Sequence, residues 1–213
     1  MDIFPSLIAA DQLNLGHEIA TLDAYCAGFH LDLMDGHFAP NIGLAPVTIH
    51  AINRASRHPV WVHIMANNPR RWIERLEIKE KSIVTIHIET KNEISGSIFD
   101  IKEKKCLPSL AISPKTPYSE AIPFLDESIN QVLIMSVEPG FYGQQFKPDV
   151  LDKIPPLVAF REQEGLSFRV ALDGGIQPEM IPMLDDLGVT QVAVANSIFS
   201  HENRLEALLA FKK

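Results

Sequence analysis

Short runs of apolar residues recur at regular spacing along the chain and predict eight β-strands. Most runs are continuous rather than alternating and are rich in Val and Ile, which is typical of parallel strands covered on both faces. The runs cover residues 3–9, 28–34, 60–65, 83–88, 107–112, 132–137, 168–172 and 191–195. Because parallel strands cannot be joined by tight hairpins, each connection should contain a crossover element.

The segments between these runs have helical character, so that each predicted strand is followed by a predicted helix. The predicted helices cover residues 14–25, 45–55, 69–76, 96–104, 118–125, 147–164, 178–187 and 202–211. Asp11 and Ser200 are expected to cap the first and last of them. Pro69, Pro117 and Pro178 lie near helix starts, where a missing backbone N–H costs little.

The repeating strand–helix unit predicts an α/β fold, a closed (β/α)8 TIM barrel that forms a single catalytic domain over residues 1–213. An open doubly wound sheet is the structural alternative. It is disfavoured because no G-x-G-x-x-G motif follows the first predicted strand. No Gly/Ser-rich linker marks a boundary between domains.

Composition and charge narrow the possible partners and the location. The chain has 19 Lys and Arg against 27 Asp and Glu, a net charge of -8, which argues against nucleic acid or an anionic membrane surface as a partner. No apolar run reaches membrane length, and residues 3–8 do not resemble a signal peptide. We therefore expect a cytoplasmic protein in which Cys26 and Cys106 are buried free thiols.

Polar residues interrupt the second predicted strand on one face. His30, Asp32 and Met34 alternate with apolar residues, so all three side chains point to the same side of the strand, into the predicted barrel. A buried Asp needs compensation for its charge, which a neighbouring His together with a cation would supply. A buried His–Asp hydrogen bond without a cation explains the pair equally well.

Two further strands carry residues of the same kind. His63 and Met65 share one face at the end of the third run, and Asp173 ends the seventh, followed by Gly174 and Gly175. Glycines there let the backbone approach a ligand closely, although Asp173 could also cap a turn. Together with His30 and Asp32, the set of two His and two carboxylates suits Zn²⁺, Fe²⁺, Mn²⁺ or Co²⁺.

With these motifs in place, the chain resembles the ribulose-phosphate 3-epimerase family, the ketose-phosphate 3-epimerases. The resemblance runs from the first strand to the eighth, and no one of its motifs would be specific alone. The matching segments are PSL at 5–7, HLDLMDG at 30–36, FAPN at 38–41, VHIM at 62–65, MSVEPGF at 135–141 and DGG at 173–175.

The resemblance implies a role for each matching residue. It implies that one divalent metal ion is held by His30, Asp32, His63 and Asp173, and that Asp32 and Asp173 are also the catalytic acid/base pair. The substrate-binding residues it implies are Ser6, His63, Met34, Met65, Met135, Gly140, Gly143, Gln144, Gly174, Gly175, Ala195 and Asn196. The residues 140–144 belong to a flap that folds over the substrate in the family.

The sequence departs from the family at the end of the site that should bind phosphate. Ala195-Asn196 stands where the family has Gly-Ser, and Tyr142 stands where the flap has a small residue. A Cβ on Ala195 could obstruct a close approach of the backbone, whereas Asn196 and the Ser197 hydroxyl are candidate donors. Tyr142 either narrows the pocket or adds a contact.

The function implied is inversion of C3 of a ketose phosphate, D-ribulose 5-phosphate to D-xylulose 5-phosphate, by two-carboxylate proton transfer through an enediolate. One alternative is a six-carbon substrate such as allulose 6-phosphate. Another is a diverged, non-catalytic barrel that binds a sugar phosphate. A Schiff-base aldolase or a decarboxylase would need a lysine at a strand end, and none is found there. The family resemblance also implies a homo-oligomer.

Overall fold

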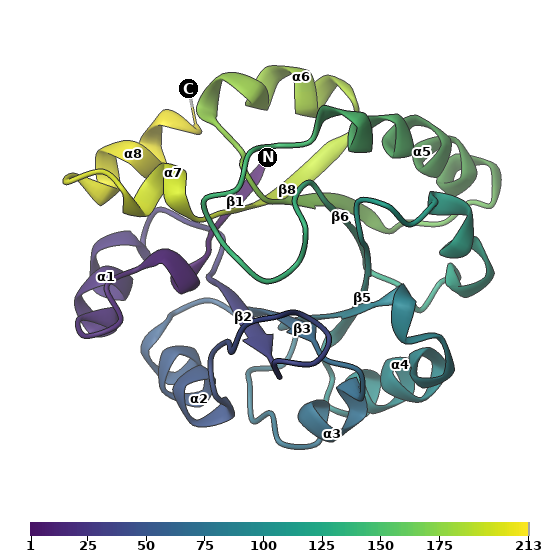
Figure 1. Ribbon diagram of the computed structural model, residues 1–213, viewed down its shortest axis with the longest axis horizontal. Coiled ribbons are helices and arrows are strands. Elements are labelled where there is room, and N and C mark those ends of the chain that lie inside the picture. The colour runs from purple at the N-terminus through teal and green to yellow at the C-terminus, as the bar shows by residue number, and fades with distance from the viewer. Residues whose placement is uncertain (213) are drawn as a thin grey trace.

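The computed structural model describes residues 1–212, and these residues form eight parallel strands that make a barrel inside a ring of helices (Figure 1). Residue 213, the last of the predicted 1–213 domain, lies outside the described residues. The strands are β1 (Asp2–Pro5), β2 (His30–Met34), β3 (Trp61–Met65), β4 (Ile83–His87), β5 (Leu107–Ile112), β6 (Gln131–Met135), β7 (Arg169–Asp173) and β8 (Val189–Val194).

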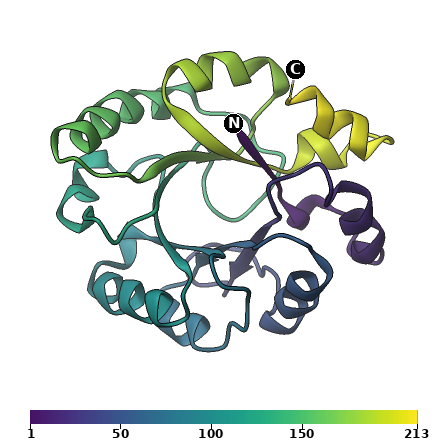
Figure 2. The same cartoon turned by 180° about the vertical axis from the view of Figure 1, so that it is seen from behind.

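Helices and short 3-10 turns connect the strands and cover their outer side, as Figure 2 shows from behind. The α-helices are α1 (Leu15–Leu22), α2 (Pro46–Ala55), α3 (Pro69–Ile73), α4 (Ile94–Glu103), α5 (Ile154–Gln163), α6 (Ile181–Asp186), α7 (Asn196–Phe199) and α8 (Arg204–Ala210). The 3-10 helices are η1 (Leu7–Ala9), η2 (Ile88–Glu93), η3 (Tyr118–Glu120), η4 (Ile122–Phe124), η5 (Pro148–Lys153) and η6 (Pro178–Met180).

The order of the strands confirms the predicted barrel. Neighbours run β1-β8-β7-β6-β5-β4-β3-β2, all parallel, and the two edges of this sheet meet where Ser6 pairs with His30 in an isolated parallel bridge. An open doubly wound sheet would keep its edge strands apart, so that alternative is wrong. Closure brings the carboxyl ends of all the strands to one end of the barrel, where active sites of this fold lie.

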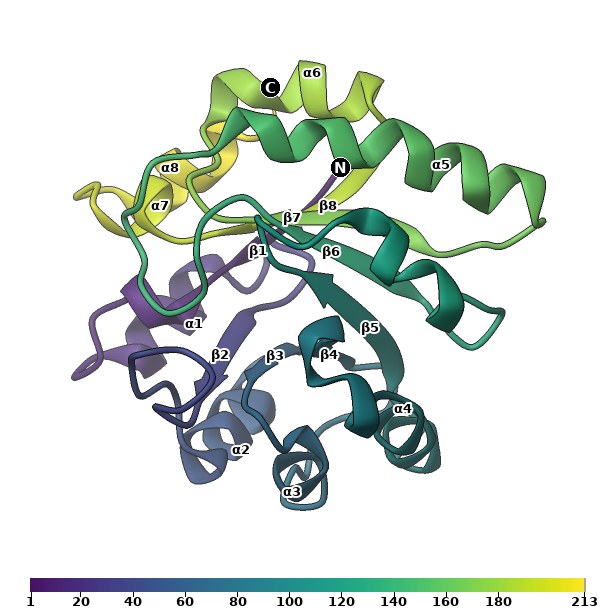
Figure 3. The same cartoon turned by 45° about the vertical axis from the view of Figure 1, so that its right-hand side comes forward.

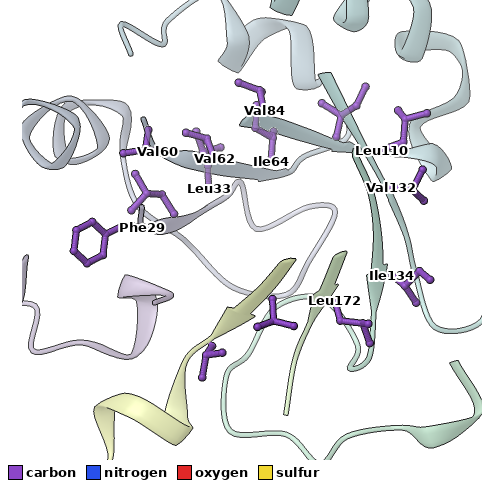
Figure 4. Packing of buried hydrophobic residues seen from close by; sticks show 14 of the residues in the cluster. Phe29, Leu33, Val60, Val62, Ile64, Val84, Leu110, Val132, Ile134 and Leu172 are labelled. Atoms are coloured by element: carbon purple, nitrogen blue, oxygen red, sulfur yellow. The ribbon is translucent and has the colours of Figure 1, made fainter. Parts of the chain in front are cut away.

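The main hydrophobic core lies between the strands and the surrounding helices. Ile64, Val132, Ile134 and Leu172 point outward from their strands into this layer and are fully buried (Figure 4). Inside the barrel, a second cluster around Trp61 fills the space below the strand ends. The strands are thereby covered on both faces, which explains their continuous apolar runs.

The structure corrects several local predictions. Asp11 does not cap α1, because its carboxylate accepts from the Leu13 backbone and the Asn14 side chain instead. Ser200 does not cap α8; Asn203 does, by accepting from the Glu206 backbone N–H.

The predicted helix over residues 118–125 is also wrong. The segment forms two 3-10 turns, η3 and η4, because Pro123 lacks the N–H that an α-helix needs in its interior. Pro69 does begin α3 and Pro178 begins η6, as predicted. Helix α7, directly after β8, was not predicted.

Cys26 and Cys106 are buried free thiols, as expected. Among residues 1–212, none of the helices is both long and apolar enough to cross a membrane.

The tight outer layer predicts a large cost for removing one of its side chains. Ile134→Ala should lower the free energy of unfolding by about 2–5 kcal/mol, since it leaves a cavity between β6 and the helices. Urea denaturation measures the change. The control is Leu13→Ala, because the Leu13 side chain is 95% exposed and its removal should change stability by about 0.5 kcal/mol or less. Equal losses in both variants would contradict this account of the core.

Candidate metal centre and active site

Four side chains from three strands meet at the carboxyl end of the barrel. They are His30 and Asp32 of β2, His63 of β3 and Asp173 of β7. One potential ligand atom from each lies within 4.8 Å of all the others. The cross-strand register explains part of this arrangement, because Asp32 pairs with His63 on the neighbouring strand.

The cluster fits a divalent cation because its inward-facing atoms have no partner of their own. Among residues 1–212, His30 Nε2 and His63 Nδ1 are buried ring nitrogens without a hydrogen bond. His63 Nδ1 lies 3.6 Å from Asp32 Oδ1 and 3.5 Å from Asp173 Oδ2, and His30 Nε2 lies 3.8 Å from Asp173 Oδ2. These separations are too long for good hydrogen bonds, and a cation placed among the four groups would satisfy all of them.

Two hydrogen bonds of Ser6 orient the cluster residues on β2, His30 and Asp32. The Ser6 hydroxyl donates to Asp32 Oδ2 at 2.8 Å, and Ser6 Oγ lies 3.1 Å from His30 Nδ1. Because the one hydroxyl proton goes to Asp32, Oγ accepts from His30 Nδ1–H. His30 Nε2 therefore carries the lone pair, and it faces the cluster.

The charge of each residue in the cluster depends on its neighbours. Burial disfavours the ionised form of Asp32, but His30 and His63 outweigh burial and hold the pKa of this carboxyl well below its usual range. Burial likewise opposes a charge on His63, but Asp173 and Asp32 raise its pKa to about 9. Without a cation, His63 is thus the positive partner of the carboxylates, and a bound cation would take over that charge and displace the proton from Nδ1.

A cavity of about 370 Å³ opens above the cluster. Asp32 and Asp173 form part of its floor, and Met34, Met65 and Met135 form an apolar wall. The volume is suited to a small metabolite. Asp32 and Asp173 are therefore the members of the cluster that can face a molecule bound in this cavity.

The cavity brings together nearly all the predicted substrate-binding residues. Those that line it are Ser6, Met34, Met65, Met135, Gly140, Gly143, Gln144, Gly174, Gly175, Ala195 and Asn196. Among the described residues, neither His63 nor His30 lines it, because both rings are fully buried beneath the carboxylates. His63, which the resemblance implied as a substrate contact, therefore does not reach the cavity surface.

The loop after β6 reaches across the carboxyl end of the barrel, as Figure 3 shows from the side. Its residues line the cavity, so the loop forms a flap over it. The Gln144 side chain donates to the carbonyl oxygens of Glu138 and Phe141 at 2.7 and 2.8 Å, which holds the loop in a compact turn. Asn41, in the loop after β2, donates to Gly140 O at 2.8 Å. The flap is therefore fixed to the opposite side of the opening, and Tyr142, exposed near its tip, lines the cavity.

Backbone forms the far end of the cavity. Gly174 and Gly175 adopt left-handed φ angles of 115° and 66°, and a Cβ at Gly175 would lie 2.7 Å from Phe146 N. Both positions thus require glycine. Ala195 has a φ of -101° and needs no glycine, whereas the Ser197 hydroxyl donates to Ile176 O at 2.6 Å, so its proton is already used.

Sequence reasoning missed two residues behind the cluster. His87 ends β4 and Glu89 follows in η2; His63 Nε2 lies 2.9 Å from His87 Nε2, and His87 Nδ1 lies 3.1 Å from Glu89 Oε2. Burial lowers the pKa of His87 to about 4. Burial opposes the charge of Glu89, but its contacts with His87, Thr116 and Ser113 lower its pKa to about 2. The signal available in the sequence was His87 itself, a polar residue on the inward face of β4.

The fold and the cluster together define a class of protein. A (β/α)8 barrel with two His and two Asp beneath a closed-over cavity at its carboxyl end is a barrel enzyme with a site suited to a divalent cation.

Comparison with known proteins identifies the family. The model of the ribulose-phosphate 3 epimerase family matches residues 2–199, so the chain belongs to this family of isomerases. The ribulose-phosphate 3-epimerase of Helicobacter pylori is 33% identical over 209 residues, which cover 98% of this chain and 95% of the relative. The cytoplasmic isoform from Oryza sativa is 31% identical over 215 residues, 99% of this chain and 92% of the relative.

Solved structures with lower identity share the fold. KGPDC from Streptococcus mutans, in complex with D-R5P, superposes with a TM-score of 0.70 at 12% identity and covers 99% of this chain and 95% of its own. A 3-hexulose-6-phosphate synthase gives a TM-score of 0.66 at 14% identity over 100% and 98% of the two chains. These matches support the barrel and carry no argument about chemistry.

The unpartnered nitrogens predict that a cation stabilises the protein. After treatment with chelator, adding Zn²⁺ at 100 times its dissociation constant should raise the free energy of unfolding by about 2.7 kcal/mol. Asp173→Asn should lose most of this gain, because it replaces a charged ligand of the cluster. Thermal melting with and without Zn²⁺ measures both effects.

The matched control is Asp152→Asn, an identical change at an exposed position of η5. It should retain the full stabilisation by Zn²⁺. An unmodified protein whose melting temperature does not respond to Zn²⁺, Fe²⁺, Mn²⁺ or Co²⁺ would refute the metal centre.

Proposed function

We propose that this chain is a metal-dependent epimerase that interconverts D-ribulose 5-phosphate and D-xylulose 5-phosphate by inverting C3. The observation that carries the proposal is that Asp32 and Asp173, from β2 and β7, face one cavity and contact the same two histidines. Inversion needs a proton removed from one face of C3 and another delivered to the opposite face. Two carboxylates on separate strands meet that need.

In this scheme a carboxylate oxygen of one aspartate takes the C3 proton, and the other aspartate, protonated, returns one from the far side. Which of them acts as base depends on the epimer bound. The intermediate is an enediolate, and a divalent cation held by His30, Asp32, His63 and Asp173 would supply positive charge that stabilises the negative charge developing on oxygen.

The wall of the cavity supports this chemistry by excluding water. Met34, Met65 and Met135 are 2–4% exposed and cover the cluster with soft, apolar side chains. A carboxylate that ligates a cation is a weakened base. Removal of water around Asp32 and Asp173 compensates for this, since a desolvated carboxylate binds a proton more strongly.

We assign the phosphate to the backbone at the ends of β7 and β8. Gly174 and Gly175 allow close approach there, and Asn196 and Ser197 begin α7, where the first backbone N–H groups have no partner within the helix. The donors would thus be backbone groups rather than the Ser197 hydroxyl.

The remaining alternatives differ in what the cavity must contain. A Schiff-base aldolase requires a lysine, and among residues 1–212 no lysine lines the cavity. A six-carbon ketose phosphate such as allulose 6-phosphate uses the same reacting groups, and a non-catalytic barrel would use none of them.

The cytoplasmic location and the homo-oligomer remain predictions.

Exchange with solvent tests the reaction and the substrate together. Incubation in D2O should place deuterium at C3 of ribulose 5-phosphate and form xylulose 5-phosphate, as followed by NMR. Faster exchange at C3 of allulose 6-phosphate would replace the five-carbon assignment with the six-carbon one. Absence of exchange with either sugar, in protein verified to contain metal, would support the non-catalytic barrel.

Removal of either proposed acid/base group should abolish turnover. Asp32→Asn and Asp173→Asn should each lower kcat by at least about 10²–10⁴-fold, the usual contribution of acid–base catalysis. Steady-state kinetics at saturating Zn²⁺ measures the loss, and metal analysis of each variant separates lost chemistry from lost metal. The Asp152→Asn control should retain wild-type kcat. A fully metal-loaded Asp173→Asn enzyme with normal kcat would exclude the two-carboxylate scheme.

A further inference from the structure

A row of hydrogen-bonded side chains leads away from the cluster to residues that do not line the cavity. His63 Nε2 lies 2.9 Å from His87 Nε2, and the other ring nitrogen of His87 lies 3.1 Å from Glu89 Oε2. Both rings are fully buried. Neither His87 nor Glu89 lines the cavity formed by the described residues. The proposed reaction therefore gives these two residues no role.

The two imidazole rings meet edge to edge. Their centroids are 5.0 Å apart with an interplanar angle of 18°, while the two Nε2 atoms are only 2.9 Å apart. The nitrogens therefore lie between the rings in nearly a common plane, which is the arrangement of an N–H···N hydrogen bond rather than of stacked faces. Phe38 packs against His87, with ring centroids 4.5 Å apart and an interplanar angle of 46°.

Glu89 is held as an acceptor by three donors. Its Oε1 accepts from the Ser113 backbone N–H at 3.0 Å and from the Thr116 hydroxyl at 2.6 Å, and its Oε2 faces His87. An ionised carboxylate can only accept, so His87 Nδ1 must carry a proton and donate it. The direction of every hydrogen bond further along the row follows from that donation.

A neutral His87 protonated on Nδ1 has a lone pair on Nε2. His87 Nε2 therefore accepts, and His63 Nε2 must donate to it. Once a cation displaces the second proton of His63, the lone pair of this ring is on Nδ1, the unpartnered atom that faces Asp32 and Asp173. The opposite tautomer of His63 would direct an N–H at the position where a cation is expected.

We propose that Glu89 and His87 are positioning residues that fix the tautomer and ring orientation of His63, so that its Nδ1 is prepared to bind a divalent cation. The inference rests on the metal site of the proposed function and assigns to that site two residues that do not touch the cation. Ser6 orients His30 from within the cavity in a comparable way. Glu89 acts from outside the cavity and can therefore be altered without touching bound substrate.

Glu89→Gln tests the proposal with almost no change in shape. The amide oxygen should turn to the Ser113 N–H and the Thr116 hydroxyl, so that the amide NH2 faces His87 and reverses the polarity of the row. His87 would then carry its proton on Nε2. When a cation binds His63 Nδ1, the proton of His63 is also on Nε2, so two N–H groups would face each other and repel. We expect the affinity for Zn²⁺ alone, measured by competition with a chromophoric chelator, to fall about 10- to 100-fold.

The matched control is Glu80→Gln, which removes an exposed carboxylate that accepts from Lys105 at 2.7 Å. Its affinity for Zn²⁺ should equal that of the unmodified protein. Tight binding by the unmodified protein with unchanged affinity in Glu89→Gln would overturn the positioning role alone. Absence of Zn²⁺ binding by the unmodified protein would overturn the metal site and, with it, this inference.

The ring protons provide a second readout that a merely structural role would not dictate and that needs no variant. In the ¹⁵N-labelled, Zn²⁺-loaded unmodified protein, long-range ¹H–¹⁵N spectra should show protons on His63 Nε2 and His87 Nδ1 and none on His87 Nε2. A proton on His87 Nε2 would overturn the proposed direction of the row.

Discussion

Asp32 and Asp173 place two negative charges in a site whose potential ligand atoms all lie within 4.8 Å of one another and which is largely closed to water. Like charges at such a distance repel strongly when the surrounding dielectric is low, so this arrangement persists only with nearby positive charge. His63, whose pKa is raised by the two carboxylates, supplies it in the absence of a cation. The paired histidines and the hydrogen bond from Ser6 compensate these two charges, whereas the apolar wall keeps out the water that would otherwise do so.

The cluster could be predicted from the sequence because it follows from the simplest rule of strand geometry. Side chains alternate along a strand, so His30 and Asp32 had to share a face, and parallel strands end at one side of a barrel. Asp173 could be included because it ends an apolar run in the same way. The position of each such residue can be read from the sequence, because it depends only on alternation within its own strand and on the common direction of all strands.

The support behind the cluster could not be predicted in the same way. The register pairs His63 with Thr85, and the contact of His63 with His87, two residues further on, depends on the tilt and stagger of the strands. Glu89 lies in η2, beyond the period-two pattern. The caps were missed for local reasons: Asn203 rather than Ser200 takes the N-cap position of α8, and Asn14 takes that of α1 without a side-chain cap bond. Ala195 and Tyr142, the two departures from the family, both line the cavity.

The seam of the barrel has a consequence for how the molecule folds. β1 and β2 are the two edges of the sheet, and they meet at the bridge between Ser6 and His30, the same two residues that share a hydrogen bond at the cluster. His30 lies on one side of this seam and Asp173, on β7, lies beyond the other. A cation bound between them would join strands from both sides of the seam, so that the full set of ligand atoms exists only when the barrel is closed.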